Sequence, residues 1–233
     1  MIDIHTHIMF GVDDGAKDIE KSLAMLKNAE ANGFTDIVLT PHYSIPRKYA
    51  NDLSVLEHNL QTLKNAASSE GINVKLYLGS EIDYYKDPTS CIGKAECMPI
   101  NHKRYLLVDF TFDQKDIDDK IYELMVAGHK VVIAHPERYK VDELFEHIKK
   151  WRKTGAVIQV DAMSFNMKKS RKVCKQLLKE RLIDVIASDA HRNEESYTEF
   201  TKVLQYIEKK TDKEYVDLIT KINPEKIIFG KSM

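Results

Sequence analysis

The hydrophobic residues along this chain occur in short runs that alternate with longer amphipathic segments. The runs at 131–133 and 185–186 are apolar without alternation, as is typical of strands buried on both faces of a parallel sheet. Seven β-strands are predicted, at residues 2–4, 36–40, 74–78, 105–110, 130–134, 156–160 and 184–188.

The segments between these strands are predicted to form helices. Apolar residues recur there every three or four positions, so that one helix face can pack against a sheet. The clearest stripes are Ile19, Leu23 and Leu26; Ile117, Ile121 and Leu124; and Leu144, Ile148 and Trp151. Glycine, which suits the left-handed end of a helix, separates a helix from the next strand at Gly33, Gly71, Gly128 and Gly155.

Seven strand–helix units without a linker or a low-complexity stretch predict a parallel α/β architecture. A length of 233 residues fits one domain spanning 1–233, and an α/β barrel needs about this length. A doubly wound sheet is the alternative, but it usually carries a glycine-rich phosphate loop, which is absent from this sequence. We therefore expect a barrel of about seven strands.

Composition and charge narrow the possible functions. The net charge of −1 and the pI near 6.8 argue against a sequence-independent hold on nucleic acid. No run approaches the roughly 18 apolar residues of a membrane span, so we expect no membrane insertion. Cleavage of a leader peptide would remove His5 and His7, and an odd cysteine count suits a reducing compartment, so we expect a cytoplasmic protein.

Polar residues with metal-binding side chains follow the predicted strands. In a barrel of this class, the carboxyl ends of the strands form the open end that carries the chemistry. His5 and His7, spaced i, i+2, would point to the same side of the first strand. The other strand-end candidates are Asp13, Asp14, His42, Glu81, Asp109, His135, Arg138, Asp161, Asp189 and His191.

Imidazole and carboxylate groups without thiolate suit Mn, Fe or Zn. About nine such groups are too many for one ion, whereas bridging carboxylates can hold two or three ions a few ångströms apart. Clustered divalent ions activate water and stabilise charge on phosphoryl oxygens, so phosphoester hydrolysis is the leading chemistry.

A thiol-based phosphatase mechanism is excluded by spacing. Such enzymes need Cys-x5-Arg, whereas six residues separate Cys97 from Arg104 and Cys174 from Arg181, and Cys91 has no arginine in range. The cysteines are expected to be structural residues.

The ordered motifs resemble a known family. They are Met1-Ile-Asp-Ile-His-Thr-His-Ile8, Val12-Asp-Asp-Gly15, Thr40-Pro-His42, Gly79-Ser-Glu-Ile82, Ala134-His-Pro-Glu-Arg138 and Ala187-Ser-Asp-Ala-His191. Over the whole chain they resemble the polymerase-and-histidinol-phosphatase (PHP) superfamily, and within it the bacterial manganese-dependent protein-tyrosine phosphatases of capsular and exopolysaccharide gene clusters. The resemblance implies a distorted (β/α)7 TIM-like barrel and a hydrolase acting on phosphotyrosine.

By this resemblance, the cofactor would be three divalent ions, in the first place Mn. The first ion would be held by His5, His7, Glu81 and Asp189; the second by Glu81, Asp109 and His135; and the third by Asp14, His42 and His191. Asp109 departs from the glutamate that is usual at its position, and Asp13 competes with Asp14. A supporting role is expected for Asp161.

Other residues are expected to contact the substrate. Arg138 could hold two phosphoryl oxygens in a fork, or pair with Glu137 at the surface. Arg192 is the only nearby candidate for a second phosphate-binding arginine found in some relatives. Tyr43 and Tyr84 could line a phenol pocket or pack at its rim. The implied partner is a phosphotyrosine protein, namely the tail of an autophosphorylating kinase that controls polysaccharide synthesis.

Three alternatives remain open from the sequence. Histidinol-phosphate phosphatase uses a similar metal set, although Asp13-Asp14-Gly15 favours the tyrosine phosphatase branch. A deaminase of the amidohydrolase type would need a strand-end lysine, which is absent. A non-catalytic barrel is disfavoured because all nine ligand positions are kept.

Overall fold

The computed structural model describes residues 1–85, 97–111 and 113–233. Within them all seven predicted strands occur, and two short strands that were not predicted follow the second and third of these. The strands are β1 (Ile2–Asp3), β2 (Asp36–Leu39), β3 (His42–Tyr43), β4 (Lys75–Leu78), β5 (Glu81–Asp83), β6 (Tyr105–Asp109), β7 (Lys130–Ala134), β8 (Val157–Asp161) and β9 (Val185–Ala187).

The strands form two parallel sheets, with the orders β1-β2-β4 and β3-β5-β6-β7-β8-β9. The chain leaves the first sheet at the end of β2 or β4 and enters the second sheet within three residues, as β3 or β5. Pro41 has no backbone N–H and lies at the first of these breaks. Two of the predicted strands, at 36–40 and 74–78, are therefore each followed by a short strand in the other sheet.

A backbone link between the first and last strands joins the two sheets on their other side. Thr6 bridges to Ala190, the His7 N–H donates to the Ala190 carbonyl at 2.9 Å, and the Asp189 N–H donates to the His5 carbonyl at 3.0 Å. The strands thus surround a common interior, and the α/β architecture is confirmed in the form of a distorted barrel with two sheets.

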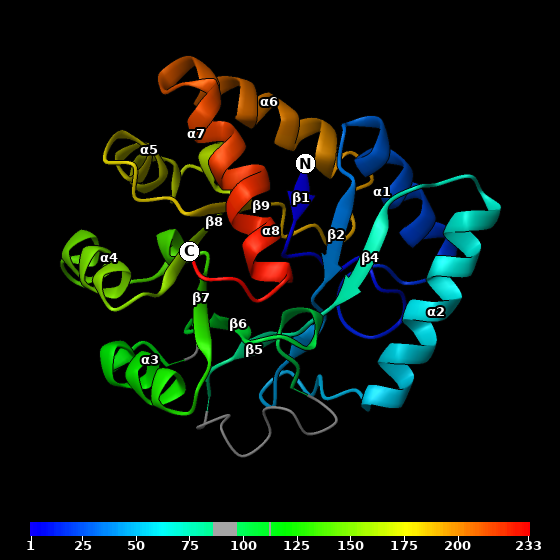
Figure 1. Ribbon diagram of the computed structural model, residues 1–233, viewed down its shortest axis with the longest axis horizontal. Coiled ribbons are helices and arrows are strands. Elements are labelled where there is room, and N and C mark those ends of the chain that lie inside the picture. The colour runs from blue at the N-terminus through cyan, green and yellow to red at the C-terminus, as the bar shows by residue number, and fades with distance from the viewer. Residues whose placement is uncertain (86–96, 112) are drawn as a thin grey trace.

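Helices lie around the strands, as Figure 1 shows. They are α1 (Ile19–Ala31), α2 (Leu53–Ser69), α3 (Ile117–Val126), α4 (Leu144–Lys153), α5 (Arg171–Lys179), α6 (Ser196–Lys210), α7 (Lys213–Asp217) and α8 (Asn223–Ile228), with a π-helical turn at Leu218–Ile222 and 3₁₀ turns at Ile100–His102, Pro136–Arg138 and Ala162–Phe165. The four predicted helix-ending glycines all have positive φ, from 72° to 96°.

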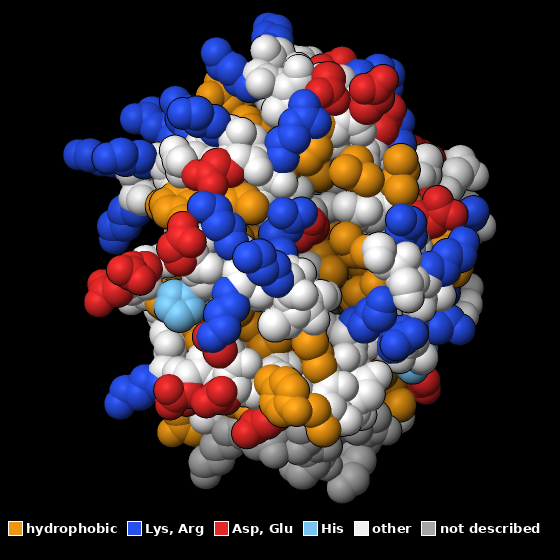
Figure 2. Space-filling view, turned by 60° about the vertical axis from the view of Figure 1, so that its left-hand side comes forward, with side chains coloured by type: hydrophobic (Ala, Val, Ile, Leu, Met, Phe, Trp, Pro, Cys, Tyr) orange, Lys and Arg blue, Asp and Glu red, His pale blue; other side chains and the backbone are white. Residues whose placement is uncertain are grey.

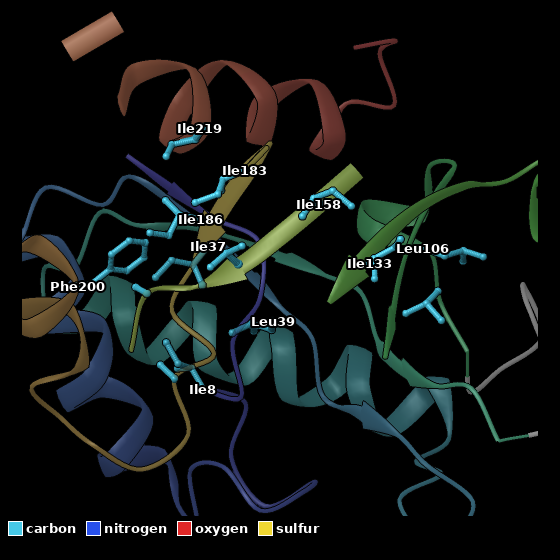
Figure 3. Packing of buried hydrophobic residues seen from close by; sticks show 14 of the residues in the cluster. Ile8, Ile37, Leu39, Leu106, Ile133, Ile158, Ile183, Ile186, Phe200 and Ile219 are labelled. Carbon is cyan, nitrogen blue, oxygen red and sulfur yellow. The ribbon is translucent and has the colours of Figure 1, made fainter. Parts of the chain in front are cut away.

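Successive side chains along a strand point to opposite faces of the sheet, and they form two separate apolar layers. Val132 and Ala134 face the barrel interior, while Val131 and Ile133 pack in the larger layer beneath the helices. Figure 3 shows part of the outer layer, in which Ile186 of β9 lies near Phe200 of α6. The predicted stripes of α3 and α4 are fully buried in this layer.

The C-terminal helix α8 fills the barrel interior from one end. Its residues Ile227 and Ile228 belong to the interior cluster together with Ile4 and Val185, and α8 lies across the strands in Figure 1. Since apolar side chains occupy this end, polar chemistry is confined to the opposite end, where the strands finish. None of the described helices combines the length and the apolar character that crossing a bilayer requires.

Candidate metal centre

The nine predicted metal-ligating side chains converge at the carboxyl ends of the strands. Four groups of ligand atoms each lie within 4.8 Å of one another: His7, Asp14, His42 and His191; His5, His7 and Glu81; Glu81, Asp109 and His135; and His42, Glu81 and Asp83. The ninth residue, Asp189, places Oδ1 at 3.4 Å from Nε2 of both His5 and His7. The structure therefore brings all nine together.

The Glu81 carboxylate lies at the centre of the cluster. It is 1% exposed, and its oxygens contact four imidazoles: His5 Nε2 at 3.4 Å, His7 Nε2 at 3.3 Å, His42 Nδ1 at 2.8 Å and His135 Nε2 at 2.9 Å. A carboxylate with two oxygens facing different histidines is suited to bridge two cations. Glu81 is therefore the residue that joins the candidate sites.

The His5-Thr6-His7 segment presents its two imidazoles from one short stretch of backbone. The Thr6 hydroxyl donates to the Val38 carbonyl at 2.9 Å and fixes the segment on β2. The Nδ1 atom of His5 lies 3.0 Å from Oε1 of Gln159, and Nδ1 of His7 lies 2.7 Å from Asp13. These partners orient both rings so that the two Nε2 atoms face the cluster.

The structure separates the roles of Asp13 and Asp14. Asp13 accepts hydrogen bonds from the backbone N–H groups of Gly15 at 2.8 Å and His42 at 3.1 Å, so its oxygens are already occupied. Asp14 instead places Oδ1 at 3.4 Å from His42 Nε2 and 3.5 Å from His191 Nε2. The geometry thus favours Asp14 as the ligand and gives Asp13 the task of orienting His7.

Gly15 is required by the close approach of the Asp13-Asp14-Gly15 turn to His7. A Cβ atom at this position would lie 1.9 Å from the His7 carbonyl oxygen and 2.6 Å from the His7 Cβ. We predict that Gly15→Ala will displace the His7 backbone, lower the free energy of unfolding by about 1–3 kcal/mol and reduce metal binding. Thermal unfolding and metal stoichiometry measure the two effects. Unchanged values of both would contradict this packing.

Asp109 and His135 form the looser part of the cluster. His135 Nδ1 lies 4.0 Å from Asp109 Oδ1, and the same oxygen accepts hydrogen bonds from the Thr111 N–H at 2.8 Å and hydroxyl at 2.6 Å. His135 has φ of 33° and Asp189 has φ of 49°, a left-handed conformation that is uncommon for residues with side chains. Strained backbone at two strand ends is typical of functional positions.

Two residues that the sequence analysis did not identify contact His42. Asp83 is buried at the end of β5, and its Oδ1 lies 3.9 Å from His42 Nδ1. Arg47 lies 2.8 Å from His42 Nε2 through its Nη1 and 3.5 Å from Asp83 through its Nε. Asp83 lies five residues beyond the end of β4, at the end of a short strand that the sequence did not predict.

The charges in the cluster influence one another strongly. Burial would raise the pKa of Glu81, but the imidazoles of His5 and His42 hold it well below its usual range. Burial lowers the pKa of His135, whereas Asp109 and Glu81 raise it, to about 9 in sum. The anionic carboxylates thus favour positive charge at their centre, which is the condition for binding a cation.

The donor set fits divalent ions. Asp14 Oδ1 and His135 Nδ1 are buried and make no hydrogen bond within the described part of the chain. Buried polar atoms without such a partner are costly, and a coordinated ion would satisfy them. The oxygen and imidazole donors suit Mn, Fe or Zn.

Arg138 lies beside this cluster. Its guanidinium contacts the carboxylates of Asp161 and, at 2.8 Å, Asp189, and its side chain is 32% exposed. The alternative of a surface pair with Glu137 does not apply, because Glu137 is buried and accepts from the Asp161 N–H at 3.1 Å. Asp161 also accepts from the Met163 N–H, so it caps a turn and holds Arg138 rather than joining a metal group.

The other three residues predicted to contact substrate are Arg192, Tyr43 and Tyr84. Arg192 is exposed, and its Nε donates to the Asp14 carbonyl at 2.6 Å, which places it at the rim of the cluster. Tyr43 and Tyr84 are 9% and 3% exposed and pack in the outer apolar layer. Their burial favours the alternative of packing over a phenol pocket, and contact of these two tyrosines with substrate stays a prediction.

Comparison with known proteins assigns the family. A sequence model of the family described as "Capsular polysaccharide synthesis, CpsB/CapC" matches residues 1–229. The chain belongs to this family. It is 36% identical over 204 residues to a putative tyrosine-protein phosphatase CapC of Staphylococcus aureus, covering 82% of this chain and 77% of that protein. It is 29% identical over 229 residues to the tyrosine-protein phosphatase YwqE of Bacillus subtilis, covering 94% of this chain and 89% of YwqE.

Solved structures agree with this CpsB/CapC assignment. A crystal structure from work on YwqE of B. subtilis and CpsB of Streptococcus pneumoniae, described as metal-dependent tyrosine phosphatases, superposes with a TM-score of 0.90 at 27% identity, covering 100% of this chain and 96% of the other. A histidinol phosphate phosphatase from Lactococcus lactis, with zinc, L-histidinol and phosphate bound, gives a TM-score of 0.55 at 14% identity, covering 89% and 94%. This second likeness concerns the fold alone.

Proposed function

We propose that this CpsB/CapC chain is a metal-dependent protein-tyrosine phosphatase. The observation that carries the proposal is the cluster centred on Glu81, with five histidines and an exposed face beside Arg138. The tyrosine phosphatase names of CapC and YwqE, and the TM-score of 0.90 to a metal-dependent tyrosine phosphatase, support it. Residues 1–233 would act as one domain.

The proposed cofactor is three divalent ions, in the first place Mn, with Fe or Zn as alternatives. His5, His7, Glu81 and Asp189 would hold one ion; Glu81, Asp109 and His135 a second; and Asp14, His42 and His191 a third. Ions bound there would supply a nucleophilic water at neutral pH and neutralise charge on the phosphoryl oxygens.

The chain's own residues then position the phosphate. Arg138, already aimed at the cluster by Asp161, offers a planar fork of N–H donors to two phosphoryl oxygens. Asp13 and Gln159 keep the Nδ1 side of His7 and His5 occupied, which leaves each Nε2 free to bind. The tyrosine leaving group has a pKa of about 10, so its departure needs little acid assistance.

The proposed substrate is a phosphotyrosine protein, such as the tail of an autophosphorylating kinase in capsular or exopolysaccharide synthesis. The family description, which concerns capsular polysaccharide synthesis, supports this assignment. We propose a cytoplasmic location, where such a tail would be accessible. The experiment that tests the proposal compares phosphate release from a phosphotyrosine peptide and from histidinol phosphate, because the latter would indicate the related small-molecule activity.

Metal chelation and thiol alkylation are expected to have opposite outcomes. Cys97 and Cys174 are fully buried, and burial raises the pKa of the Cys174 thiol; Cys91 lies outside the described residues. We predict that EDTA abolishes phosphatase activity, that added Mn restores it, and that iodoacetamide leaves most of it intact. Loss of activity with iodoacetamide but not with EDTA would overturn the metal mechanism.

A further inference from the structure

A basic groove runs between α5 and α6, on the side of the barrel formed by β8 and β9. It consists of two adjoining depressions with volumes of about 300 and 260 Å³, and both are lined by Lys175 and Tyr206. The cations that line it are Arg171, Lys175, Lys179, Arg181, Lys202 and Lys210. We call this feature the α5–α6 groove.

Most of the positive charge in the α5–α6 groove is not neutralised by the protein. Glu199 pairs with Lys202 at 2.7 Å, and Asp212 pairs with Arg181. The other four cations form no ion pair within residues 1–85, 97–111 and 113–233. On a chain whose net charge is −1, this concentration is a local feature, and Figure 2 shows Lys and Arg side chains gathered toward the upper left of the molecule.

The floor of the groove is aromatic. Lys175 Nζ lies 5.8 Å from the centre of the Tyr206 ring, and the Phe165 and Tyr206 rings pack at 6.3 Å. Aromatic rings beside cations provide contact area for a peptide and hold the lysine over the groove. A purely solvated charged helix face would lack this floor.

One end of the groove lies at the N-terminal parts of α5 and α6, which follow the strand ends that carry the candidate metal centre. Phe165 ends the 3₁₀ turn that begins directly after Asp161, the partner of Arg138. Arg171 is the first residue of α5, and α6 follows the loop that carries Asp189 and His191. Both walls of the groove therefore begin where the strands end, which is the side that carries the chemistry.

We propose that the α5–α6 groove binds an acidic stretch of the same polypeptide whose phosphotyrosine occupies the metal centre. This inference rests on the proposed function and adds the class of substrate. Helix α5 has nine residues and is about 13 Å long, so an extended peptide of roughly four residues spans it. Glutamate, aspartate or further phosphotyrosine side chains on that stretch meet the unpaired cations.

The test uses two phosphotyrosine peptides of equal length. One carries glutamates four to ten residues from the phosphotyrosine on both sides, and the other carries glutamines at the same positions. The wild-type protein is expected to have about tenfold higher kcat/KM for the acidic peptide, mainly through KM, and to lose this preference at high salt. Lys175→Glu is expected to remove the preference while leaving turnover of the glutamine peptide unchanged.

The matched control is Lys64→Glu, an equal charge reversal at an exposed position of α2, which lies far from α5 in Figure 1. It should retain the preference. Equal kcat/KM for both peptides in the wild type, or an equal preference in Lys175→Glu, would overturn the inference. Loss of binding to anionic lipid vesicles in Lys175→Glu, with unchanged peptide kinetics, would overturn it in favour of a membrane surface. Absence of any phosphotyrosine turnover would instead count against the proposed function.

Discussion

Replacing Glu81 by glutamine is expected to lower kcat/KM for a phosphotyrosine peptide by about a thousandfold or more. The Glu81 carboxylate contacts four imidazoles and belongs to three of the four candidate metal groups. Glutamine keeps the size of the side chain but replaces one oxygen by an NH₂ group that cannot bind a cation, so at least two ions lose a ligand. Metal stoichiometry, measured on the same preparation, should fall together with activity.

The control for this substitution is Glu57→Gln, at an exposed position of α2. It removes the same charge at a position that belongs to none of the candidate metal groups, and should leave both metal content and kcat/KM unchanged. Full activity and full metal content in Glu81→Gln would remove the basis of the three-ion assignment.

Replacing Arg138 by lysine is expected to lower kcat/KM by about a hundredfold without changing metal content. Lysine keeps the positive charge, but its ammonium group lacks the planar pair of N–H donors with which a guanidinium binds two phosphoryl oxygens at once. The guanidinium contacts Asp161 and Asp189 and is partly exposed toward the cluster. Steady-state kinetics with a phosphotyrosine peptide, together with metal analysis, separate this effect from loss of ions.

Arg104→Lys serves as its control, because Arg104 is exposed and precedes β6 at the opposite end of the barrel. Its kinetics should equal those of the wild type. A loss of metal in Arg138→Lys would show that Arg138 acts by supporting Asp189 and not by binding phosphate.

The sequence was sufficient to predict the strand ends and the nine residues that meet there. The prediction of these residues succeeded because parallel strands all end on one side of a barrel, so residues that directly follow the strands lie close together. The i, i+2 spacing of His5 and His7 and the buried run before His135 are local signals of that kind.

The parts that were missed depend on tertiary contacts. After Leu39 the chain leaves the first sheet, and His42 becomes part of β3 in the second sheet. No local sequence pattern indicates that β5 will place Asp83 beside the same histidine. Arg47 contacts His42 only because its loop folds back over β3. Likewise Tyr84 follows a ligand strand, but its side chain turns into the apolar layer, against Phe110 at 5.4 Å.

Phosphate release by metal-free protein reconstituted with Mn is the most direct test of the proposed tyrosine phosphatase activity, with a phosphotyrosine peptide, a phosphoserine peptide and histidinol phosphate compared at equal concentration. We predict fast, chelator-sensitive turnover of the phosphotyrosine peptide and little turnover of the other two. Preference for histidinol phosphate, or phosphotyrosine turnover that persists after complete removal of metal, would contradict it.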